Sequence, residues 1–100
     1  MTSVFKALAD PTRRKILQLL KSGPITAGEL AGHFNVSKPT MSAHFAVLRE
    51  AGLIGSEKDG KHVIYWLNAS VLEEALLAFT GALGLDLGRA ARSASDPREA

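Results

Sequence analysis

Residues 37–49 include a cluster of short polar and cationic side chains and contain no carboxylate. No aspartate or glutamate occurs between Glu29 and Glu50. Most surface helices mix lysine with glutamate, and this stretch does not. A carboxylate placed beside a phosphate would repel it. This stretch therefore favours contact with a polyanion. The candidate contact residues are Ser37, Lys38, Pro39, Thr40, Ser42, Ala43, His44 and Arg49.

An apolar pattern places these side chains on a helix, residues 37–51. Apolar residues recur at steps of four, three and three, which defines one helical face. They are Met41, Phe45, Leu48 and Ala51. Ser37 can cap the N-terminus, Pro39 is tolerated in the first turn, and Gly52 stands where a left-handed C-cap belongs. The polar groups cluster near the N-terminus of this helix.

A shorter helix precedes it across a tight turn. Thr26 and Glu29 form a Thr-x-x-Glu capping box, which predicts a helix that begins there and runs to about Phe34. Asn35 and Val36 then form the turn. Two helices joined in this way are typical of a helix-turn-helix, whose second helix enters the major groove of DNA.

The hydrophobic period changes to alternation after Gly52. Residues 54–58 and 61–67 flank Asp59-Gly60, and this dipeptide between such runs is a strong signal for a two-residue hairpin. Lys58 and Lys61 flank the tip, where they could reach phosphates or the adjacent minor groove. Solubilising turn charges are an equally good interpretation of these two lysines.

Two helices open the chain. The first ends near Ala9, and Asp10-Pro11 predicts an N-cap followed by proline at the first position of a second helix, which runs to about Lys21. A basic run, residues 13–15, lies at the start of that second helix. It could contact the DNA backbone, but the more conservative interpretation pairs one of the two arginines with Asp10 or Glu50.

The last helix runs from about Ser70 to Leu83, with a further extension toward Leu87. Its apolar residues cover more than one face, which is typical of a helix buried on two sides. A chain of 100 residues cannot easily bury both sides alone, so the second side is expected to meet another copy.

Composition indicates one globular domain, residues 1–88, followed by a flexible tail, residues 89–100. Residues 1–66 carry nine Lys/Arg against five acids, whereas residues 67–100 carry three against five. A basic body suggests a polyanionic partner, although an ordinary solvated surface explains it as well. The chain has no cysteine, no membrane-length apolar stretch and no signal-peptide layout, so a cytoplasmic location is expected.

Three motifs occur in order and resemble the ArsR-type (ArsR/SmtB) bacterial repressors. They are residues 5–17 (FKALADPTRRKIL), residues 37–45 (SKPTMSAHF) and residues 48–54 (LREAGLI). The resemblance covers about residues 3–80. Within the family it is strongest to the SdpR-type autorepressor branch.

The resemblance implies a mainly α winged helix-turn-helix with four helices, a β-hairpin and a final helix. It further implies a homodimer joined by the first and last helices that represses transcription from an inverted-repeat operator. The expected dimer-interface residues are Val4, Phe5, Leu8, Leu72, Leu76, Phe79 and Leu83. The expected partners are double-stranded DNA, a second copy and an unidentified small-molecule or protein effector.

The chain departs from the family at its sensing sites. Many members bind metals through Cys-Val-Cys, where this chain has Ala31, Gly32 and His33. Others use Asp/His pairs on the last helix, which here contains no histidine. Because metals need converging ligands and thiol sensing needs cysteine, we expect no metal, cofactor or redox site.

The sequence fits two other functional classes less well. A winged helix that binds protein is the alternative, although an acidic or apolar recognition face would have favoured it. An enzyme is not expected, because no phosphate loop or nucleophile elbow occurs and Ser42 and His44, two residues apart on a helix, point in different directions.

Overall fold

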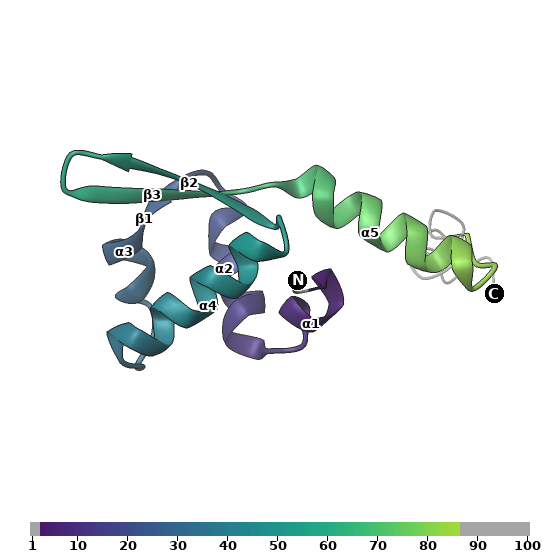
Figure 1. Cartoon of the computed structure of the whole chain (residues 1–100), viewed down its shortest axis with the longest axis horizontal. Helices are drawn as coiled ribbons and strands as arrows, with labels where there is room; N and C mark the ends of the chain where they lie inside the picture. Colours follow the sequence, from purple (N-terminus) through teal and green to yellow (C-terminus); the bar gives the residue numbers. More distant parts are fainter. Residues whose placement is uncertain (1–2, 87–100) are drawn as a thin grey trace, which may run out of the picture.

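The computed structural model describes residues 3–86 and has a winged helix-turn-helix architecture (Figure 1). The elements in chain order are α1 Val4–Leu8, α2 Pro11–Leu20, β1 Ile25–Thr26, α3 Ala27–Ala31, α4 Lys38–Glu50, β2 Ile54–Asp59, β3 His62–Leu67 and α5 Ala69–Ala82. The expected mainly helical fold is confirmed. Residues 87–100, including the expected tail and the extension of the last helix to Leu87, lie outside the described residues.

Within the described chain, side-chain caps begin four of the helices. Ser3, Asp10, Thr26 and Ser37 each hold an extended backbone and accept a hydrogen bond from the N–H three residues on. Such caps satisfy helix N–H groups that have no intrahelical partner. Helix α3 ends at Ala31 rather than near Phe34, because Gly32 caps it and turn-type bonds replace the helical pattern over the next two residues.

One core holds helices α1 to α4 against the sheet. Its buried members are Ala7, Ile16, Leu17, Leu20, Leu30, Met41, Phe45, Leu48, Leu53, Ile54 and Tyr65. The inner face of α4 contributes Met41, Phe45 and Leu48, as its spacing predicts. Phe45 stacks on Tyr65 of β3 with ring centroids 4.5 Å apart, so α4 is anchored directly to the sheet.

The sheet has three antiparallel strands in the order β1-β3-β2. Strand β1 was not expected from the sequence, because two residues carry no detectable alternation. The hairpin loop is Gly60-Lys61 rather than Asp59-Gly60, since Asp59 still pairs with His62. Gly60 has φ +60° and is the first residue of the loop, the position at which a type II′ turn needs glycine.

Helix α5 extends away from the body, at the end of the molecule opposite the hairpin tip (Figure 1). Within the described chain, no residue of α5 is fully buried. Leu77 and Phe79 are exposed on it, and so is Leu83 at its C-cap. Over residues 3–86, no helix is both long and apolar enough to cross a membrane.

Candidate nucleic-acid interface

The outer face of α4 presents the polar side chains expected to contact DNA. Ser37, Lys38, Pro39, Thr40, Ser42, Ala43 and Arg49 are all exposed. The hydroxyl of Ser37 caps the helix by accepting from Thr40 N at 3.3 Å, and it donates to Thr40 Oγ1 at 2.9 Å. Ser37 therefore orders the first turn, and the hydroxyl proton of Thr40 remains available to a ligand.

Arg49 stands apart from this cluster. It belongs to the last turn of α4, so its Cα lies about 16 Å along the helix axis from that of Lys38. The cluster that can enter a groove is accordingly the first half of α4.

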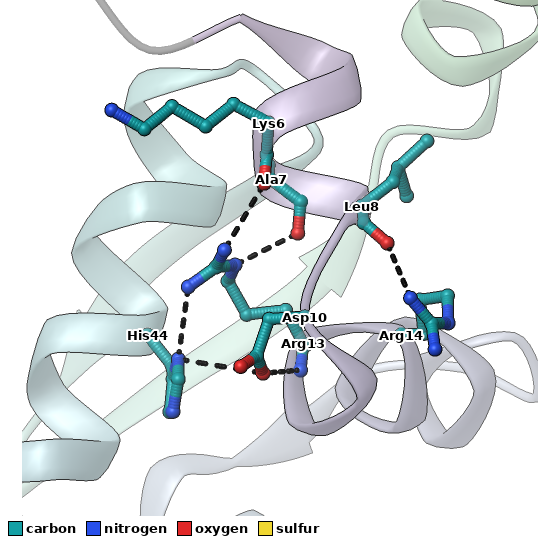
Figure 2. A network of polar contacts seen from close by, with 7 residues as sticks. All are labelled: Lys6, Ala7, Leu8, Asp10, Arg13, Arg14 and His44. Atoms are coloured by element: carbon teal, nitrogen blue, oxygen red, sulfur yellow. Dashed lines mark hydrogen bonds and ion pairs between the residues drawn. The ribbon is translucent and has the colours of Figure 1, made fainter.

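His44 faces inward from the flank of α4, unlike the other candidates. Its side chain is 15% exposed. Its Nδ1 lies 3.2 Å from Arg13 Nη1 and 3.9 Å from Asp10 Oδ2 (Figure 2). His44 thus belongs to a polar contact between α4 and the start of α2, which the sequence did not indicate.

Arg13 and Arg14 bind the carboxyl end of α1. Arg13 Nε donates to Ala7 O at 2.7 Å and Nη2 to Lys6 O at 3.0 Å, while Arg14 Nη1 donates to Leu8 O at 2.7 Å (Figure 2). These carbonyls end a five-residue helix, and such terminal carbonyls attract cations. The guanidinium groups therefore fasten α1 to α2, a role that neither earlier interpretation of the basic run included.

Asp10 connects the same contact to the cap of α2. Its Oδ2 accepts from Arg13 N at 3.0 Å. This backbone hydrogen bond holds the pKa of Asp10 below its ordinary value, assisted by the neighbouring charge of Arg13 and opposed by burial. The carboxylate form is therefore favoured in the folded chain.

The wing carries charges of both signs. Lys58 on β2 and Lys61 in the loop are exposed. Glu57 and Asp59 lie beside Lys58 on β2. At the base of the hairpin, Gly55 lies against the indole of Trp66, with which a Cβ at that position would overlap. The hairpin is thereby fixed by close packing at its base, and its lysines extend from a defined strand pair.

A further contact holds the turn between α3 and α4. Lys15 Nζ lies 5.0 Å from the ring centroid of Phe34 and donates to His33 O at 3.2 Å. Lys15, the third residue of the basic run, therefore stabilises the turn between α3 and α4. Over residues 3–86, no three His, Cys, Asp or Glu side chains come together to hold a metal.

Two shallow hollows accompany the fold. One, of about 230 Å³, lies between α3 and α4 and includes Lys38 and Ser42 in its lining. The other, of about 280 Å³, is lined by Leu8, Leu72 and neighbouring residues of α2. Both fall below the roughly 300–1,000 Å³ of ordinary ligand pockets, so neither by itself indicates a small-molecule effector.

The residues expected at a dimer interface lie on α1 and α5. Val4, Leu8 and Leu72 pack partly against the core. Phe5 and Phe79 contact each other with ring centroids 4.7 Å apart and remain exposed. Leu76, one turn after Leu72, is half-buried and Leu83 is exposed. The Phe5–Phe79 pair therefore brings α1 and α5 into contact, and Leu8 and Leu72 line the same hollow.

Comparisons with known proteins agree with this geometry. Residues 10–56 match the model of the bacterial regulatory proteins of the arsR family. The transcriptional repressor SdpR of Bacillus subtilis is 50% identical over 76 residues, which cover 76% of this chain and 84% of that protein. The arsenical resistance operon repressor of Staphylococcus aureus is 36% identical over 76 residues, covering 76% and 73%. The crystal structure of an ArsR family transcriptional regulator matches with a TM-score of 0.69 and 37% identity, covering 79% of this chain and 84% of that one.

Proposed function

Because the chain belongs to the arsR family of bacterial regulatory proteins, and is thus a DNA-binding transcriptional repressor rather than an enzyme, we propose that it acts as a homodimer on an inverted-repeat operator. Each copy inserts the first half of α4 into a major groove, and the wing contacts the flanking backbone. Two-fold symmetry then sets the half-sites about one helical turn, roughly 34 Å, apart. The protein acts in the cytoplasm by covering a promoter.

The observation that carries this proposal is the exposed, carboxylate-free first half of α4. Lys38, Thr40 and Ser42 are exposed there, and the buried face of the same helix is fixed by the core. Short polar groups can approach base edges closely, and lysine can neutralise a phosphate. The exposed Lys58 and Lys61 on the wing add charge of the same sign.

The homodimer is proposed on the apolar surface of α5. Leu83 is 59% exposed and Phe79 46% exposed on a helix with no buried residue of its own. A contiguous apolar surface of this kind marks an association site. Phe5 of α1 extends the surface by its contact with Phe79. The interface is therefore proposed to use both helices.

We propose that repression is relieved without a metal or a thiol. The chain has no cysteine, and its three histidines occupy different elements: His33 follows α3, His44 is in α4 and His62 begins β3. Control by a small molecule or by a sequestering protein partner is left.

The decisive experiment is electrophoretic mobility shift on a duplex that the wild-type protein selects from a random-sequence pool. Specific binding should weaken steeply as salt rises, because neutralised phosphates release counterions. Lys38→Glu should abolish binding, whereas Lys21→Glu, the same charge change at the end of α2, should largely retain it. Binding that ignores salt, or equal loss in both variants, would favour a protein-binding winged helix instead.

A further inference from the structure

The contact between Arg13 and His44 constrains the protonation of the histidine. Arginine is a donor only and stays charged in proteins. At 3.2 Å from Arg13 Nη1, His44 Nδ1 must therefore supply a lone pair. In a neutral imidazole that accepts at Nδ1, the proton is carried by Nε2.

The other protonation states fit the surroundings poorly. A proton on Nδ1 would point at the guanidinium, donor against donor, and 3.9 Å to Asp10 Oδ2 is too long for a hydrogen bond. The imidazolium carries that same Nδ1 proton and therefore meets the same donor-against-donor conflict. The guanidinium is itself fixed, because its other nitrogens donate to Ala7 O and Lys6 O.

The nitrogen that carries the proton points away from this contact. Figure 2 shows one ring nitrogen of His44 toward Arg13 and Asp10 and the other directed away from both. His44 lies one turn after Thr40 on α4, at the flank of the exposed face, and 15% of its side chain is exposed. A donor on the flank of a groove-binding helix meets the sugar-phosphate backbone, since the base edges lie beneath the middle of the helix.

We propose that Arg13 is a positioning residue that fixes the Nε2–H tautomer of His44, so that this N–H donates to a phosphate oxygen of bound DNA. Arg13 itself touches no DNA in this arrangement. The inference rests on the proposed DNA-binding function and adds a specific backbone contact to it. It also explains why the side chain of Arg13, in the first turn of α2, is directed toward α1 and His44.

The first test reads the tautomer directly. Long-range proton–nitrogen NMR spectra of the full-length ¹⁵N-labelled protein, free of DNA at neutral pH, distinguish the two tautomers and the imidazolium. The His44 signals are identified by their loss in His44→Asn. We expect only the Nε2–H form in the wild type and a measurable share of the other forms in Arg13→Leu, which has no donor at that position. An Nδ1–H or charged ring in the wild type, or the same populations in Arg13→Leu, would overturn the proposal.

The second test separates the two ring nitrogens by substitution and needs no change at Arg13. The amide oxygen of Asn reaches about the position of Nδ1, and the amide nitrogen of Gln about that of Nε2. His44→Asn keeps an acceptor for Arg13 but loses the outward donor, so DNA affinity should fall about tenfold or more, as expected for a lost bond to a charged group. His44→Gln restores an outward donor and should bind more tightly than His44→Asn.

Affinities are measured on the selected duplex. Thermal melts of both variants show whether a loss of affinity comes from a loss of folded protein. Wild-type affinity in His44→Asn, or weaker binding by His44→Gln than by His44→Asn with both folded, would refute the phosphate contact. If the wild type binds no DNA, the proposed function fails together with that contact, while the NMR spectra still decide whether Arg13 fixes the tautomer.

Discussion

Leu83 provides the sharpest test of how two copies associate. It continues a stripe at helical spacing with Leu72, Leu76 and Phe79 on α5, and 59% of it is exposed in the single chain. Fully burying a leucine side chain contributes about 1.5–3 kcal/mol. An interface that covered its exposed part would gain roughly 1–2 kcal/mol from each copy, or about 2–4 kcal/mol in a two-fold dimer. Leu83→Ala should therefore raise the dimer Kd by about 30-fold to several hundredfold.

Leu77 is the matched control. It is 58% exposed, so Leu77→Ala removes the same side chain at the same exposure. Its helical neighbours one turn earlier are Glu73 and Glu74, which place it on the charged face of α5. Sedimentation across a concentration series should find Leu77→Ala as dimeric as the wild type.

The fold of the single chain should survive both changes. Each leucine is already mostly exposed, and such surface substitutions usually alter stability by less than about 0.5 kcal/mol. Circular dichroism at high protein concentration checks this. An unchanged dimer Kd in Leu83→Ala, or an equal shift in both variants, would mean that the stripe through Phe79 is not the interface.

Two further substitutions test the packing and the caps. Gly55→Ala should cost about 1–3 kcal/mol of unfolding free energy, because its Cβ would overlap the indole of Trp66, whereas Gly81→Ala, in open space on α5, should not destabilise. A thermal melt of Gly55→Ala like that of the wild type would show that the indole moves aside freely. Asp10→Ala should cost about 1 kcal/mol at pH 7 in urea unfolding through loss of the cap. Folding lowers the pKa of Asp10 from 3.8. The stability difference between wild type and Asp10→Ala is therefore present above pH 3.8 and should vanish as the pH falls through the folded pKa. A stability difference that persists in strong acid would refute the role of the carboxylate.

Much of the fold was predictable because its signals are local. Asp10, Thr26 and Ser37 cap helices where their types predict, and the spacing of Met41, Phe45 and Leu48 identifies the buried face of α4. The hairpin was predicted to within one residue. The error arose because either neighbour of Gly60 can share a two-residue loop with it, and only strand pairing decides between them.

The features that escaped prediction depend on tertiary pairing. Strand β1 exists because Ile25 and Thr26 pair with Tyr65 and Ile64, partners about forty residues away in sequence. His44 was grouped with the exposed residues of α4 because the sequence shows only that it is polar. Its contacts with Asp10 and Arg13 require the packing of α2 against α4, which no local pattern specifies.

The arginines of α2 illustrate the deepest limit of sequence reasoning here. From the sequence alone, carboxylates are the obvious partners of an arginine, because the residue type identifies an acidic side chain. Every residue, however, has a backbone carbonyl, and those of Lys6, Ala7 and Leu8 accept from Arg13 and Arg14. Backbone acceptors become special only where a helix ends and leaves them without intrahelical partners. A five-residue helix such as α1 consists largely of such ends. Arginines that closely follow a short helix in the chain can therefore pair with its carbonyls as well as with carboxylates.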